Sequence, residues 1–122
     1  MNKKQPINYY QEYKVLKKRS ELKKLELKLL DSDSPRSIKV QSDIDLCYSK
    51  MDEIENAIET YVPDGVDTRT FNRLSDERMF LECRYLMGMT MEQTAEAMYI
   101  SRDTAYRIRR RIVNENPQGA TA

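Results

Sequence analysis

The chain has 122 residues, of which 39% are apolar and 34% are charged, with three glycines and four prolines. This composition is typical of one compact domain and excludes a large enzyme or a fibrous chain. The 21 basic and 20 acidic side chains give a net charge of +1, so overall charge indicates neither nucleic acid, a membrane surface nor an acidic partner. Any such binding must come from local clusters of charge.

Metal sites and enzymatic chemistry find little support. There is no histidine, and Cys47 and Cys83 lie far apart without neighbouring ligands, so we expect no metal, no cofactor and two reduced thiols. Carboxylates are abundant, but no nucleophile motif or phosphate-binding loop accompanies them, which predicts neither an enzyme nor a small-molecule substrate. No secretory signal or membrane span is expected either, so the sequence predicts a cytoplasmic protein.

The first predicted element is a helix at about 7–30. This stretch has no glycine or proline, and Val15, Leu22 and Leu29 recur every seven residues with Leu25 between them, which is helical periodicity. We expect these four side chains to form the apolar side of the helix. Three more leucines broaden that side: Leu16, Leu27 and Leu30. The interspersed lysines and glutamates predict a solvated face and not a DNA-binding one.

A second helix is predicted to begin near Ser42, because residues 31–37 are dense in turn formers and Pro35 biases Ser34 away from helical dihedral angles. Its apolar residues form a heptad seam: Ile44, Cys47, Met51, Ile54, Ile58 and Tyr61. Two helices joined by about ten residues predict an antiparallel hairpin. The sequence leaves open whether the seam closes within the chain or against a second copy, as a homodimer through the N-terminal helices.

Three tyrosines near the start of the first helix admit two interpretations. Tyr9, Tyr10 and Tyr13 form either a docking patch for a partner or a group that packs onto the hairpin. The sequence favours neither.

Residues 63–71 are predicted to form a linker, because Pro63-Asp64-Gly65 has turn chemistry and no periodic pattern precedes Phe71. The chain is thereby divided into a helical arm, 1–62, and a C-terminal domain, 72–122. Three helices are expected in that domain: about 72–87, 91–98 and 102–114. In the first of them, the run Ser75-Asp76-Glu77 supplies a capping hydroxyl and acids near the start.

Two tight corners are predicted between these helices. Gly88 stands where a left-handed residue ends a helix, and Thr90 and Gln93 match a capping box that begins the next one. Ser101 is expected to be a second N-cap, with Asp103 in the first turn. Small and apolar residues flank this second corner: Ala95, Met98, Ile100, Ala105 and Ile108. The spacing predicts a helix-turn-helix motif.

Positive charge gathers on the last of these helices. Residues 101–113 contain five arginines and one aspartate, Asp103, which gives 5 − 1 = +4. We expect five side chains to be exposed there: Arg102, Tyr106, Arg107, Arg110 and Arg111. Guanidinium groups bind phosphates as charged forks and donate two hydrogen bonds to guanine in the major groove, so the helix is predicted to bind double-stranded DNA.

The segments 84–95 (RYLMGMTMEQTA) and 100–107 (ISRDTAYR) resemble region 4 of sigma-70 factors. The likeness is closest to small phage-encoded regulators with a sigma-region-4-like motif, including late transcription activators of the ArpU and RinA types in phages of Gram-positive bacteria. It covers about 45 residues, 72–116, and is only architectural before them. The resemblance implies an all-α fold and a late-gene activator that binds promoter or operator DNA with the host RNA polymerase, in the bacterial cytoplasm.

The resemblance also implies which residues meet DNA. It places Ser101, Arg102, Tyr106, Arg107 and Arg110 on the DNA-facing side of the second helix and brings residues 90–93 near the phosphate backbone. From both arguments, the predicted DNA-binding residues are Thr90, Gln93, Ser101, Arg102, Thr104, Tyr106, Arg107, Arg110 and Arg111.

Two positions depart from the family pattern. Tyr99 takes the turn position at which many helix-turn-helix proteins carry glycine, and Ala105 replaces the commoner valine, so a reshaped corner is expected. No segment resembles the sigma region that melts promoters, so a complete sigma factor is not expected. The alternative function is that of a small terminase-like or coiled-coil adaptor for DNA packaging, in which oligomerisation is the main task.

Overall fold

A computed structural model describes residues 5–115, and every regular element in this range is helical. In chain order the elements are α1 (Ile7–Lys28), α2 (Pro35–Glu59), α3 (Thr68–Leu81), the π-helical η1 (Glu82–Leu86), α4 (Met91–Ala97) and α5 (Arg102–Glu115). The predicted all-α fold class is therefore confirmed for this range. The outer ends of the two predicted domains, 1–4 and 116–122, lie outside the described residues.

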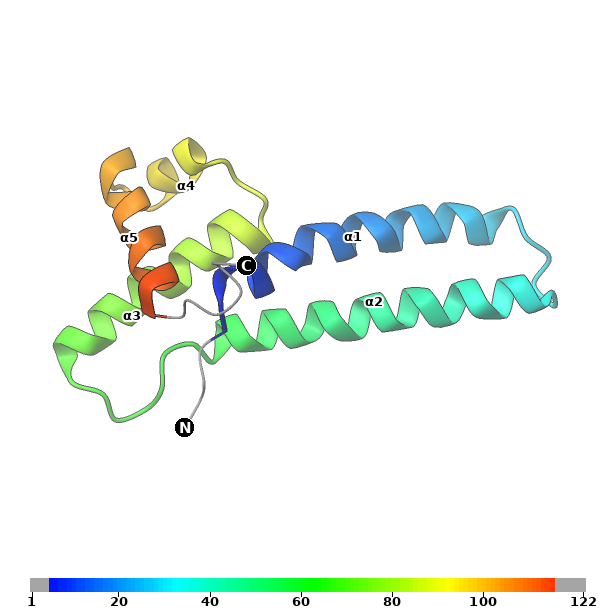
Figure 1. The fold of residues 1–122 in the computed structure, drawn as a ribbon, viewed down its shortest axis with the longest axis horizontal. Helices are drawn as coiled ribbons and strands as arrows, with labels where there is room; N and C mark the ends of the chain where they lie inside the picture. Colours follow the sequence, from blue (N-terminus) through cyan, green and yellow to red (C-terminus); the bar gives the residue numbers. More distant parts are fainter. Residues whose placement is uncertain (1–4, 116–122) are drawn as a thin grey trace.

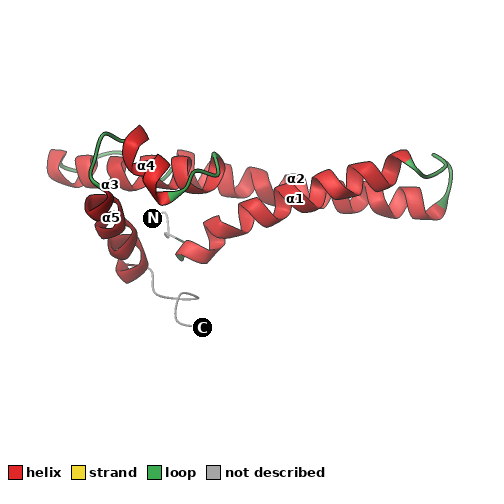
Figure 2. Cartoon of the chain, turned by 90° about the horizontal axis from the view of Figure 1, so that it is seen from above, coloured by secondary structure: helices red, strands yellow, loops and turns green. Residues whose placement is uncertain are grey.

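The two longest helices, α1 and α2, lie antiparallel and side by side and project from the other helices (Figure 1). We call α1, α2 and the connection 29–34 the arm. All six residues of the predicted α2 seam are buried, none with more than 7% of its surface exposed. The seam is therefore covered within the same chain, by α1 and, at Tyr61, by α3. Figure 2 shows α4 and α5 at the end of the molecule opposite the tip of the arm.

The predicted start of α2 near Ser42 is wrong, because the helix begins at Pro35. The Ser34 hydroxyl is its cap and accepts a 3.0 Å hydrogen bond from the backbone N–H of Ser37. Proline is favoured in the first helical turn, since its fixed φ suits a helix and its missing N–H would have no partner there. From the sequence, Pro35 is interpreted as part of a break between the helices. In the structure it is the first residue of the second helix.

The buried face of α1 is also different from the predicted one. Val15, Leu22, Leu25 and Leu29 are 54%, 58%, 58% and 87% exposed. The buried residues of the helix are Ile7, Tyr10, Tyr13, Leu16 and Ser20. Of the leucines expected to broaden the apolar side, Leu16 is buried and Leu27 and Leu30 are half-buried. The buried residues and the exposed apolar residues each recur at helical spacing, but they lie on different sides of the helix. The helix α1 therefore has one apolar face toward α2 and another toward solvent.

The tyrosines near the start of α1 pack inside the protein. Tyr10 and Tyr13 are buried, with 1% and 9% of their surface exposed. Tyr9 is half-buried, and its ring meets that of Tyr10 edge to face with the centroids 5.4 Å apart. Of the two interpretations, packing is the one observed.

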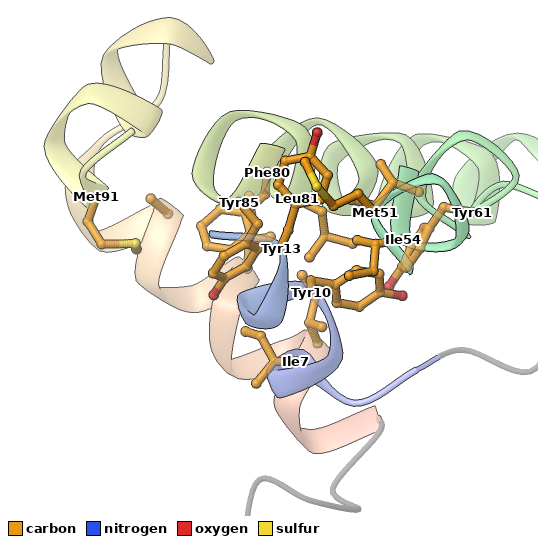
Figure 3. Close-up of a cluster of buried hydrophobic side chains, with 14 of the residues drawn as sticks. Ile7, Tyr10, Tyr13, Met51, Ile54, Tyr61, Phe80, Leu81, Tyr85 and Met91 are labelled. Atoms are coloured by element: carbon orange, nitrogen blue, oxygen red, sulfur yellow. The ribbon is translucent and has the colours of Figure 1, made fainter. Parts of the chain in front are cut away.

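One hydrophobic core joins the base of the arm to the C-terminal helices (Figure 3). Tyr10 from α1, Ile58 from α2, Phe80 from α3 and Ile112 from α5 all belong to it. The predicted linker, 63–71, therefore does not separate two cores, and the arm and the C-terminal helices are one packed unit.

The helix α3 begins at Thr68, inside the predicted linker, with Asp67 as its N-cap residue. The expected capping run at 75–77 lies in the middle of the helix, so that prediction is wrong. A Ser-Asp-Glu run acts as a cap only where backbone N–H groups lack helical partners, which is not so in a helix interior. The helix continues into η1, where the Met87 N–H donates to the Glu82 carbonyl at 2.9 Å, a wider turn than in an α-helix.

Candidate nucleic-acid interface

Both α4 and α5 begin at a residue whose side chain caps the helix. The Gln93 N–H donates a 3.1 Å hydrogen bond to the Thr90 hydroxyl, and the Thr90 N–H donates a 2.9 Å bond to Gln93 Oε1, so the predicted capping box is confirmed. Gly88 has a φ of +71°, the left-handed conformation expected of it. At the start of α5 the Thr104 N–H donates to Ser101 Oγ at 3.1 Å, which confirms the second cap.

The corner between α4 and α5 is a Schellman motif centred on Tyr99. The Ile100 N–H donates to the Ala95 carbonyl at 3.0 Å and the Tyr99 N–H to the Glu96 carbonyl at 3.1 Å. Tyr99 has a φ of +57°, in the left-handed region that favours glycine. The tyrosine thus adopts the glycine conformation at a cost in backbone strain, and the expected reshaping of the corner is not seen at this residue. Its side chain is 96% exposed.

The helix α5 has a buried edge and an exposed edge. Its buried residues are Ala105, Ile108 and Ile112, none more than 4% exposed. On the opposite side, exposed residues follow one another at helical spacing: Asp103, Arg107, Arg110 and Asn114. Arg107 and Arg110 therefore project away from the core, where an anionic ligand has access to them.

Arg102 and Tyr106 lie beside this edge, at the start of α5. The Arg102 guanidinium is 5.7 Å from the centroid of the Tyr106 ring, and its Nη2 is 3.3 Å from Oε1 of Glu92 in α4. A hydrogen bond with Tyr106 and the nearby Glu92 charge raise the pKa of Arg102. Since both ionic side chains are about 60% exposed, solvent screens their attraction and the pair contributes little to stability.

Like Tyr106, Arg111 is half-buried and not exposed as predicted. Its Nε donates a 2.8 Å hydrogen bond to Glu77 Oε2, and its Nη2 donates a 3.3 Å bond to the Arg73 carbonyl. Both partners are in α3. These two bonds hold the Arg111 guanidinium against α3, although the rest of the side chain borders Arg107 and Arg110 at the surface.

A buried polar cluster centred on Glu77 is the feature that sequence reasoning missed. Glu77 is 0% exposed; its Oε1 accepts a 2.6 Å hydrogen bond from the Tyr61 hydroxyl. Its Oε2 accepts from Arg111 at 2.8 Å and from Arg73 at 3.3 Å, and Arg73 also pairs with Glu115. The cluster therefore connects the end of the arm with α3 and α5.

One sequence signal for this cluster was available. Glu77 stands three residues after Leu74 and three before Phe80, both of which are buried apolar residues of α3. That spacing places the carboxylate on the apolar face of the helix. An acid on such a face needs a buried partner, which the sequence alone does not identify.

The other predicted contacts remain at the surface or near it. Thr90, Gln93 and Ser101 are exposed, and Thr104 is half-buried with its hydroxyl 2.8 Å from that of Ser101. These hydroxyls serve the helix caps, while the side-chain NH₂ of Gln93 remains a donor. The charged residues of α4 are Glu92 and Glu96, so the positive surface belongs to α5.

Comparison of the chain with protein-family models, with curated proteins and with solved structures finds no match. Within residues 5–115, no group of three or more His, Cys, Asp or Glu side chains is arranged to hold a metal ion. In the same range no helix combines the length and apolar character needed to cross a membrane. Cys47 and Cys83 are buried free thiols, and burial raises the pKa of Cys83.

Proposed function

We propose that the protein is a sequence-specific DNA-binding transcription regulator that places α5 in the major groove of promoter or operator DNA. In this proposal, α4, the corner at Tyr99 and α5 act as a helix-turn-helix unit, and the arm supplies a surface for partners. The observation that carries the proposal is the exposed edge of α5, on which Arg107 and Arg110 project from a helix capped at its start and packed along its other side.

The chemistry of this edge suits the major groove, which is wide enough to admit an α-helix. Arg107 and Arg110 each have a planar fork of donors that fits guanine O6 and N7 or a phosphate. Asp103 is an acceptor, so it suits the amino group of cytosine and is repelled by phosphate. Arg102, beside the corner, is available to the same groove or to its phosphate border once it leaves Glu92.

A regulatory role is supported by the likeness of residues 84–107 to region 4 of sigma factors, and in particular to late activators of phages. The proposed partner is the RNA polymerase of a bacterial host. Residues 84–107 include both caps and the Schellman corner, so the likeness covers the part of the chain that positions α5.

The test is selection of random DNA fragments by the purified full-length protein, followed by sequencing and by affinity measurements at about 50 and 200 mM salt. We expect one enriched motif. On that motif, Arg107→Ala and Arg110→Ala should each weaken binding by about 5- to 150-fold where the arginine contacts a base. A smaller loss that is equal on all sequences and lowers the salt dependence identifies a phosphate contact.

Arg36→Ala is the matched control. Arg36 lies at the tip of the arm and pairs with Glu26 at 2.6 Å, so its loss removes the same charge far from α5. Its DNA affinity should stay within about twofold of the parent, since a distant surface charge contributes little. Failure to enrich a motif, with binding insensitive to Arg107→Ala and Arg110→Ala, would refute sequence-specific recognition by α5.

Regulation is tested separately, with purified bacterial RNA polymerase and a promoter that carries the enriched motif. Activation or repression of transcription that is lost in the Arg107→Ala protein supports the regulator. Transcription that is unchanged by bound protein argues against it while leaving DNA binding intact.

A further inference from the structure

The solvent side of α1 carries a second heptad pattern. Val15, Leu22 and Leu29 occupy one heptad position, and Lys18 and Leu25 occupy the other. We call these five residues the outer seam. Its four apolar side chains are between 54% and 87% exposed, whereas α2 covers the other face of the same helix. The outer seam is about 21 Å long at 1.5 Å per residue.

The outer seam has the shape that a facing helix needs. It borders a groove of about 820 Å³ between α1 and residues 85–88. Val15, Lys18, Arg19 and Leu22 line this groove at positions i, i+3, i+4 and i+7. In coiled coils, four residues with this spacing frame the hole that receives a side chain of the partner helix. These four residues of the groove therefore frame a position for an apolar side chain of a facing helix.

The charges beside the seam identify which helix fits. The flanking heptad positions hold Lys14, Glu21 and Lys28 on one side and Arg19 and Glu26 on the other. Two parallel copies of α1 would place Glu21 opposite Glu26 and Lys14 opposite Arg19, which are like charges. Two antiparallel copies would place Glu21 opposite Lys28 and Arg19 opposite Glu26. Opposite charges meet only in the antiparallel arrangement, so α1 is complementary to a second copy of itself.

We propose that the protein forms an antiparallel homodimer through the outer seams of two α1 helices. The two-fold axis passes between Leu22 and Leu25, so that Leu22 of each copy packs on Leu25 of the other. Leu29 of the second copy enters the groove, over the stem of Lys18 and between Val15 and Leu22. The interface is isologous and closed, which limits the assembly to a dimer.

This inference deepens the proposed function by giving it two DNA-binding units. Tyr10, which shares the core with α5, is 13.5 positions from the two-fold axis. At 1.5 Å per residue, the two arm bases then lie roughly 40 Å apart along α1. Half-sites one turn of DNA apart are separated by about 34–36 Å. Because each α5 lies beyond the base of its arm (Figure 1), the two α5 helices are at least this far apart, and the dimer suits inverted half-sites separated by at least one helical turn.

The experiment measures the mass of the full-length protein without DNA, by sedimentation equilibrium from micromolar to millimolar concentration. A seam about 21 Å long buries less surface area than a standard interface, which buries about 1,600 Å². A micromolar or weaker dimer is therefore expected. Leu22→Lys should abolish it. Leu46→Lys is the matched control, because Leu46 is 57% exposed on α2 and Leu22 is 58% exposed on α1. Circular dichroism establishes that both variants fold.

A charge exchange tests the orientation. Glu21→Lys and Lys28→Glu alone should each weaken the dimer by about 5- to 30-fold, since each turns two opposite-charge contacts into like-charge ones. The double variant Glu21→Lys/Lys28→Glu restores the antiparallel pairing and should recover the parent affinity. Failure of the double variant to recover it overturns the antiparallel arrangement.

Other outcomes are equally decisive. A monomer at all concentrations overturns the proposal, as does an assembly larger than a dimer or a dimer weakened equally by Leu46→Lys. Because no DNA is present, a failure here is distinguishable from a failure of DNA recognition, which the Arg107→Ala and Arg110→Ala variants measure independently.

Discussion

The hydroxyl of Tyr61, just beyond the end of α2, donates a 2.6 Å hydrogen bond to Oε1 of the buried Glu77 in α3. The other oxygen of the same carboxylate accepts from Arg111 of α5 at 2.8 Å. A single carboxylate thus links the base of the arm to the helix proposed to enter DNA. Hydrogen bonds to a buried charge are stronger than those between neutral groups, so this link contributes to the stability of the whole unit.

Tyr61→Phe should lower the free energy of unfolding by about 1.5–3 kcal/mol, because it removes a hydrogen bond to a buried carboxylate. Urea denaturation monitored by circular dichroism measures the change. Tyr99→Phe is the matched control, since Tyr99 is 96% exposed, and it should change the stability by less than about 0.5 kcal/mol. Equal stability of the Tyr61→Phe and parent proteins would contradict the role given to this hydrogen bond.

The buried tyrosines also predict how stability depends on pH. Burial and the hydrogen bond to Glu77 raise the pKa of Tyr61, and burial raises the pKa of Tyr10 to about 12. In the unfolded chain both phenols ionise near pH 10, so above that pH the folded state holds more protons than the unfolded state. Their contribution is complete below pH 10 and is lost as the pH rises toward the folded pKa values.

The measurable result is a free energy of unfolding that falls above pH 10 by up to roughly 1.4 kcal/mol per pH unit for each such tyrosine. Urea denaturation between pH 8 and pH 11 gives this slope. In the Tyr61→Phe and Tyr10→Phe variants, the slope of the free energy of unfolding against pH should be shallower, because each variant lacks the contribution of one tyrosine. A slope that is the same in both variants and the parent would show that other groups cause it.

Adjacent arginines on α5 should have opposite phenotypes. Arg111→Met removes a hydrogen bond to Glu77 and should lower the free energy of unfolding by about 1–3 kcal/mol, with DNA affinity of the folded protein nearly unchanged. Arg110→Met changes an exposed residue, so stability should stay within about 0.5 kcal/mol while DNA affinity falls. Urea denaturation and DNA titration of both variants decide the matter, and reversed phenotypes would show that the exposed edge of α5 is wrongly assigned.

The sequence predicts the α4–α5 corner well because its signals are local. Thr90, Gln93 and Ser101 form their caps with backbone groups three residues away, and Gly88 sets its own φ. Such motifs need no knowledge of the rest of the fold. The α2 seam is predicted equally well, since a single apolar face in a two-helix contact has to be buried.

The faces of α1 and α5 depend instead on long-range packing. The heptad spacing of Val15 and Leu22 correctly identifies an apolar face of α1, but that face is exposed. The helix has another apolar face, with Tyr13 and Leu16, and this is the face that is buried. Periodicity shows that a face is apolar and does not show what lies against it. Arg111 is a similar case, since its partner Glu77 is 34 positions earlier in the chain.

Replacing the strained residue of the corner should stabilise the protein. Tyr99 has a φ of +57°, which costs about 1–2 kcal/mol for a residue with a Cβ atom. Tyr99→Gly removes that cost, but glycine has greater conformational freedom in the unfolded chain, which offsets part of the gain. The free energy of unfolding is expected to rise by roughly 0.5–1 kcal/mol. Tyr99→Ala keeps the strain and should show no increase. Thermal unfolding compares the two, and a destabilised Tyr99→Gly protein would refute the strain at this position.

Two threonines of the α4 region should respond with opposite signs to the same change. Thr94 is 0% exposed, and its hydroxyl has no hydrogen-bond partner in the described part of the chain, whereas the Thr90 hydroxyl accepts a 3.1 Å bond from Gln93. An unsatisfied buried hydroxyl costs about 1–3 kcal/mol, so Thr94→Val should raise the free energy of unfolding by roughly 1 kcal/mol. Thr90→Val removes an N-cap and should lower it by about 0.5–2 kcal/mol.

Urea denaturation of both valine variants under identical conditions compares these signs directly. Because the substitution is the same in each and the two positions lie within one helical turn or so of each other, changes in the unfolded chain largely cancel. A Thr94→Val protein that is less stable than the parent would contradict this prediction. It would mean that the buried Thr94 hydroxyl makes a stabilising hydrogen bond.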